Sequence, residues 1–300
     1  MPDKKLIAIV GPTASGKTTL GISLAQKFDG EIVSADSRQI YRGMDIGTAK
    51  PTPEERRAIP HHLIDIRDPD EDYTVADYQR DAVTAINDII ARGKVPFLVG
   101  GTGLYVRAVV ENLNIPKTIA NPKLREEIEN DIARDGFEAV FKKLVALDPD
   151  AANVVDPRNP RRVVRALEVA LTTGVPFTAQ RTKNAPLFET LTLGLNPAQE
   201  VLRNRIDRRI DEMMENKFID EVNMLVVRYG ADASAFNAIG YRELIEYLNG
   251  KLTMEDSIAA IKMNTWHYAK RQLTWFKKTP EIRWTESSDE ALSFITTLLK

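Results

Sequence analysis

An eight-residue segment near the N-terminus constrains the fold of this chain more than any other feature. Its residues match the phosphate-binding pattern G-x-x-x-x-G-K-[ST] and are Gly11, Pro12, Thr13, Ala14, Ser15, Gly16, Lys17 and Thr18. The glycines let the backbone curl so that successive N–H groups face an anion, the lysine adds a positive charge, and the Thr18 hydroxyl can ligate Mg²⁺. Because such a loop joins a strand to a helix, the motif predicts an α/β protein that binds a phosphorylated ligand.

The flanking sequence has the elements that the loop requires. Residues 6–10 form a short apolar run of strand length, and Leu20, Leu24 and Phe28 recur at helical spacing after the loop. Further strands are expected at residues 31–34, 62–66, 95–99 and 189–195, with a helix over residues 75–91. Strands that alternate with helices are typical of a doubly wound parallel sheet, so we predict a P-loop NTPase-like fold.

The pattern changes near residue 115 and predicts an inserted domain. Residues 121–173 show helical spacing without a convincing strand, and Asn159-Pro160 is a strong helix start. Because a strand is predicted again at residues 189–195, the helical block interrupts the α/β pattern. We therefore divide the chain into a catalytic core, residues 1–114 and 186–300, and an inserted all-helical domain, residues 115–185. Long helices are expected over residues 198–228 and 254–278.

Basic residues gather in three places although the formal net charge is only −2. The clusters are Arg158, Arg161, Arg162 and Arg165; Arg203, Arg205, Arg208 and Arg209; and Lys262, His267, Lys270, Arg271, Lys277 and Lys278. Only the second cluster has interleaved acids, which are typical of a self-paired surface helix. The first and third clusters therefore leave a polyanionic partner possible.

The phosphate-binding loop does not by itself say which bond breaks. Most such loops serve nucleoside triphosphates and are accompanied by an Asp at a strand end that helps to hold Mg²⁺, a role that Asp65 could take in a kinase. The other candidate acid is Asp36, which follows the strand at residues 31–34. Because the carboxyl ends of parallel strands converge, one pocket could hold Thr13, Asp36 and Thr102. The plainer alternatives are a turn or cap role for Asp36 and a helix N-cap role for Thr102.

Several blocks of sequence, taken together, resemble the tRNA dimethylallyltransferases. Besides the phosphate-binding loop they are SADSRQIY at residues 34–41, DIGTAKP at 45–51, GGTGLY at 100–105, NPRRVVRALE at 159–168, AIGYRE at 238–243 and YAKRQLTWF at 268–276. They run in the family's order over nearly the whole chain and are far more specific than the loop alone.

The resemblance implies a reaction and assigns roles to residues. A dimethylallyl group would pass from dimethylallyl diphosphate to N6 of the tRNA adenosine on the 3′ side of the anticodon, position 37, and diphosphate would leave. Residues 11–18 would bind the diphosphate, with Lys17 beside the leaving group and Mg²⁺ on Thr18. Asp36 would act as the base, and Thr102 would contact the reacting end.

The resemblance also implies contacts with the tRNA anticodon stem-loop. The stretch from Arg161 to Arg165 matches the family's tRNA-contacting residues, whereas Arg125 is a candidate from its place at the head of the inserted helices and Arg271 from its face of the last long helix. The full set of expected tRNA contacts is Asp36, Ser37, Arg38, Gln39, Thr102, Arg125, Arg161, Arg162, Val163, Val164, Arg165, Arg271 and Gln272. An adenosine inside an anticodon loop must be unstacked and turned outward to reach such a pocket.

Three other functions remain open from the sequence. An adenylate isopentenyltransferase would share the loop and Asp36 but would not need the inserted arginines, a small-molecule kinase would use the loop for ATP, and a non-catalytic RNA-binding module would leave Asp36 without a purpose. No apolar run is long enough to span a membrane, the chain contains no cysteine, and we expect no secretory signal. We expect a cytoplasmic protein and take a monomer as the working expectation.

Overall fold

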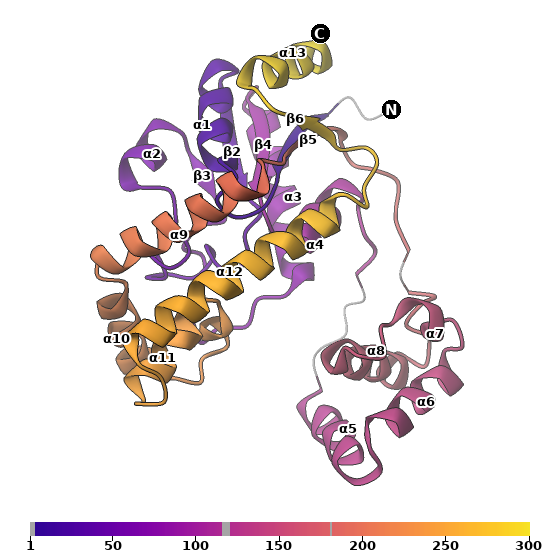
Figure 1. The fold of residues 1–300 in the computed structure, drawn as a ribbon. Coiled ribbons are helices and arrows are strands. Elements are labelled where there is room, and N and C mark those ends of the chain that lie inside the picture. The colour runs from indigo at the N-terminus through magenta and orange to yellow at the C-terminus, as the bar shows by residue number, and fades with distance from the viewer. Residues whose placement is uncertain (1–3, 116–120, 181) are drawn as a thin grey trace. The chain divides into compact units, whose positions relative to one another are not determined.

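The protein, seen here as a computed structural model, is described over residues 4–115, 121–180 and 182–300. It comprises two compact units (Figure 1). The core unit consists of Met1–Val110 and Pro186–Lys300, and the helical unit consists of Glu111–Ala185. None of the helices in the described ranges is long and apolar enough to span a membrane.

The core unit is built on a six-stranded sheet in the order β3-β2-β4-β1-β5-β6. The strands are β1 Lys5–Val10, β2 Gly30–Ser34, β3 His61–His62, β4 Val95–Gly100, β5 Glu189–Leu195 and β6 Arg283–Thr285, and all neighbouring pairs are parallel. In the central register, Ile9 lies opposite Val99 on one side and Leu193 on the other. The predicted parallel α/β sheet is therefore confirmed.

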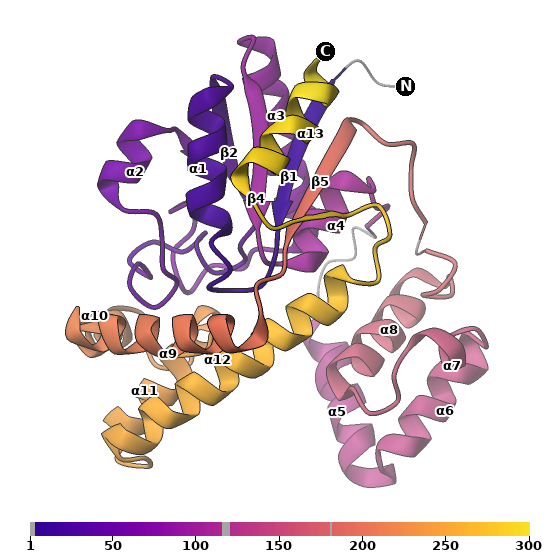
Figure 2. The same cartoon turned by 45° about the horizontal axis from the view of Figure 1, so that its top comes forward.

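Helices cover both faces of the sheet, as the buried side chains of β1 show. Ile7 and Ile9 point to the face covered by α1, Lys17–Lys27, and α13, Ser288–Leu299. Leu6 and Ala8 point to the opposite face, which α3, Val75–Ala91, and α4, Gly103–Val110, cover (Figure 2). Residues 6–10 of β1 are buried on both faces of the sheet, which is why they form a continuous apolar run rather than an alternating one.

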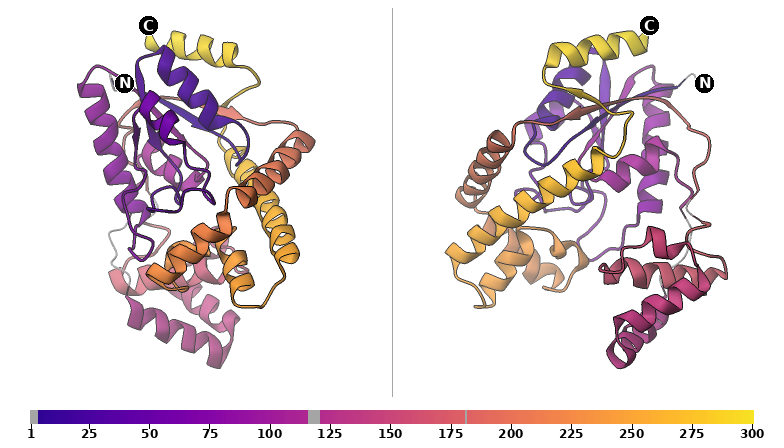
Figure 3. Two further views of the ribbon diagram at one scale, coloured as in Figure 1. Left: turned by 90° about the vertical axis from the view of Figure 1, so that its left-hand side faces the viewer. Right: turned by 45° about the vertical axis from the view of Figure 1, so that its right-hand side comes forward.

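A separate layer of helices lies where the strands end at their carboxyl edge (Figure 3). It contains α9 Gln199–Glu215, α10 Phe218–Tyr229, the 3₁₀ turn Ser234–Asn237, α11 Tyr241–Leu248 and α12 Met254–Phe276. These helices share an apolar core centred on Phe218, Tyr241 and Ile206. β1 ends at the phosphate-binding loop, and the chain enters α9 soon after the end of β5. This layer of helices therefore places side chains against the phosphate-binding loop.

The helical unit has its own small core. It contains α5 Pro122–Asp135, α6 Phe137–Leu147, α7 Ala151–Val154 and α8 Pro160–Thr173. The buried side chains include Ile128, Leu144 and Val163. The predicted helix start at Asn159 is confirmed, because its side chain accepts a hydrogen bond from the Arg162 N–H at 3.2 Å.

The predicted strand at residues 62–66 is largely wrong. Only His61 and His62 pair with β2, and the backbone then turns, with positive φ angles of 62° at Leu63 and 57° at Asp65. The Asp65 carboxylate accepts from Lys50 Nζ at 2.5 Å and from Arg56 at 2.7 Å. Asp65 therefore lies in a turn beyond the end of β3, paired with two cations, and not at the end of a strand.

Candidate active site

The phosphate-binding loop has the backbone shape that its sequence predicts. Gly11 is in a conformation that L side chains rarely adopt, and a Cβ there would approach the carbonyl oxygen of Leu195 to 2.9 Å. Gly16 adopts the left-handed conformation, with φ 95°, and provides no side chain to cap the N–H groups of α1. The Ser15 hydroxyl is buried without a hydrogen-bond partner in the part of the chain that the structure describes. Free donors at a helix N-terminus are suited to binding an anion.

The environment of Lys17 in this loop disfavours its charged form. Its Nζ donates to the carbonyl oxygen of Pro12 at 3.0 Å. Burial lowers the pKa of Lys17 to about 8; the negative charge of Asp36 opposes this effect and the positive charge of Arg209 adds to it. An approaching anion would therefore stabilise the ammonium ion.

Two arginines of α9 lie at the same loop, and sequence reasoning did not assign them there. Arg205 donates to the carbonyl oxygen of Ser15 at 3.3 Å, and burial lowers the pKa of Arg209. Arg208 does pair with Glu212, at 3.2 Å, as expected of a self-paired helix. That expectation is wrong for Arg205 and Arg209, and the usable sequence signal was their i, i+4 spacing, which places them on one helix face.

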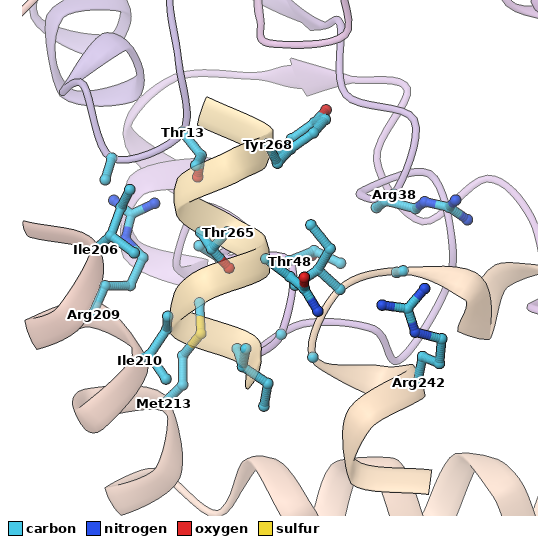
Figure 4. Close-up of a pocket in the computed structure, with 18 of the residues that line it drawn as sticks. Thr13, Arg38, Thr48, Ile206, Arg209, Ile210, Met213, Arg242, Thr265 and Tyr268 are labelled. Carbon is cyan, nitrogen blue, oxygen red and sulfur yellow. The ribbon is translucent and has the colours of Figure 1, made fainter. Parts of the chain in front are cut away.

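Two cavities border the phosphate-binding loop. We call the cavity that Asp36 lines the main cavity; it has about 510 Å³ and is drawn in Figure 4. The second cavity, called the outer groove, has about 540 Å³. Ala14 and Arg209 line both of them. The main cavity is also bordered by residues 36–38 and 47–49 and by α9 and α12, whereas the outer groove is bordered by Ser15, Gly16, Thr19, Arg205 and Arg208. The two cavities thus meet the loop at Ala14 and share the side chain of Arg209.

The loops that follow β2 and β4 are joined by hydrogen bonds beside the main cavity. The Ser37 N–H donates to Thr102 Oγ1 at 3.0 Å, and the Thr102 N–H donates to the carbonyl oxygen of Ala35 at 3.1 Å. Asp36 Oδ1 accepts from the Arg38 N–H at 2.8 Å, so the turn role does exist, but it involves a single carboxylate oxygen. Thr13, Asp36 and Ser37 line the cavity. Thr102 is not one of its lining residues and reaches the site through its hydrogen bond with Ser37.

α12 contributes side chains to this site. Tyr268 and Arg271 line the main cavity, and the Arg271 guanidinium lies 5.9 Å from the centre of the Tyr268 ring. Burial, reinforced by the charge of Asp36, raises the pKa of Tyr268 to about 12, while a hydrogen bond with Thr102 opposes the rise. Tyr268 therefore remains a neutral hydrogen-bonding group at physiological pH.

Gln272 and Gln39, two of the expected tRNA contacts, use their side-chain amides for hydrogen bonds within the core unit. Gln272 is buried: its Oε1 accepts from the Thr13 N–H at 2.8 Å, and its Nε2 donates to the carbonyl oxygen of Gly101 at 2.9 Å. Gln39 Nε2 lies 3.3 Å from the carbonyl oxygens of both Thr48 and Ala49. Arg38 lies at the cavity, where it donates to the carbonyl oxygen of Ala235 at 3.2 Å.

The expected tRNA contacts of the helical unit fall into three groups. Val163 is part of the core, and Val164 packs against it. Arg125 and Arg165 donate to the buried carboxylate of Glu168, at 3.0 and 2.7 Å, and these bonds lower its pKa against the effect of burial. Arg161 and Arg162 are exposed. The arginines are thus the members of this set that present charge at the surface.

The fold and the site together define a P-loop α/β protein with an inserted helical unit and with cationic side chains at the phosphate-binding loop. The model of the IPP transferase family matches residues 39–279, so the chain belongs to that family. The family resemblance seen in the sequence blocks is confirmed.

Relatives and solved structures agree with this assignment. A tRNA dimethylallyltransferase of Roseiflexus sp. is 49% identical over 92% of this chain and 91% of its own length, and one of Thermomicrobium roseum is 48% identical over 94% and 86%. The solved tRNA isopentenylpyrophosphate transferase of Bacillus halodurans is 44% identical, with a TM-score of 0.73 over 99% of this chain and 96% of that one. A eukaryotic dimethylallyltransferase acting on tRNA is 30% identical, with a TM-score of 0.84 over 99% and 80%.

Proposed function

We propose that this protein transfers a dimethylallyl group from dimethylallyl diphosphate to N6 of the adenosine at position 37 of tRNA. The observation that carries the proposal is a cationic phosphate-binding loop that opens on a cavity containing a carboxylate, Asp36. The relatives, which are named for this activity, support the same reaction.

The loop side of the site suits the leaving diphosphate. Lys17, Arg205 and Arg209 bring three cationic side chains to the loop, and the buried Ser15 hydroxyl lacks a partner among the described residues. As the carbon–oxygen bond of the donor breaks, its electron pair leaves with the diphosphate and negative charge grows there. Donors already fixed at this place stabilise the transition state more than the ground state.

The proposed Mg²⁺ fits a site that is completed by the substrate. No group of three or more His, Asp or Glu side chains that could hold a metal occurs in the described residues. Magnesium commonly uses one or two protein oxygens together with phosphate oxygens, so the Thr18 hydroxyl and the diphosphate would hold it. The ion would neutralise part of the charge on the diphosphate.

The opposite side of the main cavity suits the acceptor. The N6 amino group of adenine is a weak nucleophile because its lone pair is drawn into the ring. In the proposed step N6 attacks C1 of the donor, the bond from C1 to the diphosphate oxygen breaks, and Asp36 takes the proton from N6. Arg38, Arg271 and the Tyr268 ring border the same space and could contact an adenosine that has been turned out of the anticodon loop.

The helical unit suits the backbone of the tRNA. Its exposed arginines, Arg161 and Arg162, together with Arg125 and Arg165, would contact phosphates. Since one chain supplies both the donor loop and the candidate base, we propose that the protein acts as a monomer, in the cytoplasm where its substrate is found. A kinase that uses Asp65 for Mg²⁺ is disfavoured because Lys50 and Arg56 hold that carboxylate.

The test is mass spectrometry of nucleosides after incubation with unmodified tRNA, dimethylallyl diphosphate and Mg²⁺. We expect one adenosine per tRNA to gain a C5H8 unit, with release of diphosphate. Parallel reactions with AMP as the acceptor and with ATP alone separate the alternatives. Allyl transfer to AMP without transfer to tRNA, or steady ATP hydrolysis without allyl transfer, would refute the proposal.

A further inference from the structure

A buried carboxylate of α10 binds the backbone of a loop that borders the main cavity. Glu221 Oε2 accepts from the N–H groups of Asp45 and Ile46, at 3.0 and 2.7 Å. Its Oε1 accepts from the Gly47 N–H at 3.2 Å and from the Tyr241 hydroxyl at 2.5 Å. The side chain is thus saturated with four donors although α10 and the loop are far apart in sequence.

The loop that Glu221 holds, residues 45–49, is a wall of the main cavity. Gly47, Thr48 and Ala49 line the cavity beside Asp36, Ser37 and Arg38. On its other edge the loop is held by Gln39, whose Nε2 donates to the carbonyl oxygens of Thr48 and Ala49. The loop is therefore linked to Glu221 on one side and to the turn that carries Asp36 on the other.

Close packing fixes the position of this loop as well. A Cβ on Gly47 would clash with the Phe218 ring, and the rings of Phe218 and Tyr241 meet edge to face with their centres 5.1 Å apart. Burial, with the charge of Glu221 adding to it, raises the pKa of Tyr241 well above its usual value, so its hydroxyl stays a donor. The loop cannot move toward α10 against these rings, and it cannot move away without breaking the contacts with Glu221.

We propose that Glu221, oriented by Tyr241, is a positioning residue for the acceptor half of the active site. It fixes residues 45–49 and, through Gln39, the turn from Asp36 to Arg38, in the arrangement that the adenine requires. This inference rests on the proposed function. A carboxylate is needed because all four partners are donors: a glutamine in its place would turn an NH₂ group toward two of them.

The proposal predicts a loss of rate rather than a loss of binding. A small displacement of a positioned group can reduce an enzymatic rate by about a hundredfold. For Glu221→Gln we expect the single-turnover rate at saturating tRNA to fall about 10- to 100-fold. We expect the affinities for tRNA and for inorganic diphosphate to stay within about threefold, because neither the arginines of the helical unit nor the phosphate-binding loop is changed.

The matched control is Glu31→Gln. Glu31 is also a buried carboxylate, bound by Arg92 and His62, but it lies near the start of β2, whereas the candidate base follows the end of that strand. The Glu31→Gln variant should have a lower melting temperature but an unchanged single-turnover rate at saturating tRNA. Hydrogen exchange should quicken at the amides of residues 45–47 in Glu221→Gln and stay unchanged there in Glu31→Gln.

A milder variant keeps the test decisive if Glu221→Gln does not fold. Tyr241→Phe removes one hydroxyl and should lower the single-turnover rate by a smaller factor. Where both variants fold, the double variant Glu221→Gln with Tyr241→Phe should lower this rate by less than the product of the two single factors. A rate that matches the Glu31→Gln control, in Glu221→Gln or, if that variant does not fold, in Tyr241→Phe, would overturn the positioning role. Failure of the unchanged protein to modify tRNA would instead refute the proposed function, so the two failures are distinguishable.

Discussion

Replacing Lys17 by methionine should make the ligand-free protein more stable and nearly inactive. Methionine has a similar length but no charge, so the change removes the ammonium ion and leaves most of the packing. Burial is the main reason that the pKa of Lys17 falls from 10.5 to about 8. At about 1.4 kcal/mol for each tenfold change in the proton equilibrium, keeping Lys17 charged costs the free protein about 3 kcal/mol.

The sign of the pH dependence follows from proton binding. Between pH 8 and pH 10.5 the unfolded chain keeps the proton on Lys17 while the folded protein loses it, so the free energy of unfolding rises with pH in this window. Below pH 8 the full cost is present. Lys17→Met removes that cost but also the hydrogen bond to Pro12, worth about 1 kcal/mol. The expected net gain at pH 7 is about 2 kcal/mol, and it should disappear by pH 10.5.

The assay is thermal melting of the ligand-free protein between pH 7 and pH 10.5, together with allyl transfer to tRNA. For a chain of this size the gain corresponds to a rise of about 5 °C in Tm at pH 7. Turnover should fall about a hundredfold or more, the effect of removing one transition-state donor. Lys251→Met, at an exposed lysine, is the control and should change neither quantity. An equal or lower Tm for Lys17→Met at pH 7, or a gain that persists at pH 10.5, would refute the reasoning.

Three further predictions test the other parts of the site. Asp36→Asn should lower the single-turnover rate about 10²- to 10⁴-fold with unchanged melting, whereas a residue with only a turn role would lose almost nothing. The pair Arg161→Ala and Arg162→Ala should weaken tRNA binding and reduce the log–log salt slope by about two, and an unchanged slope would remove them from the interface. Gln272→Glu should lower kcat with little change in tRNA affinity, because one carboxylate oxygen would face the carbonyl oxygen of Gly101; lost affinity with full kcat would indicate direct tRNA contact instead.

Local signals explain why much of the fold could be predicted. The apolar run, the phosphate-binding loop and the helix that follows it are encoded in adjacent residues. Asn159 and Pro160 likewise mark a helix start, because the Asn159 side chain accepts a hydrogen bond from the first turn of the helix. The strand predicted at residues 62–66 failed for the opposite reason. The conformation at Asp65 depends on ion pairs with Lys50 and Arg56, which the chain brings together only after folding.

The residues of the site that could not be predicted from the sequence are those whose positions depend on how the helices pack. Which face of α9 meets the phosphate-binding loop depends on how that helix packs, so Arg205 and Arg209 looked like members of a surface helix. The same holds for Val163, which matched a tRNA-contacting stretch but lies in the core of the helical unit. Glu221 carries no local signal, because three of its four partners are backbone N–H groups about 175 residues away and the fourth is the hydroxyl of Tyr241 on another helix.

The electrostatics of the free site explain why a diphosphate is a suitable ligand. Lys17 and Arg209 are both desolvated, and the charge of Arg209 itself lowers the pKa of Lys17, so the two cations repel each other before any ligand is present. An anion that carries several charges would offset both this repulsion and the unfavourable desolvation of the two cations. A singly charged anion would offset them less. In the proposed reaction this relief would grow as the carbon–oxygen bond breaks, because the departing diphosphate would gain charge next to Lys17. Because this added charge would be present in the transition state and absent from the bound donor, the loop would then contribute to the reaction rate as well as to binding.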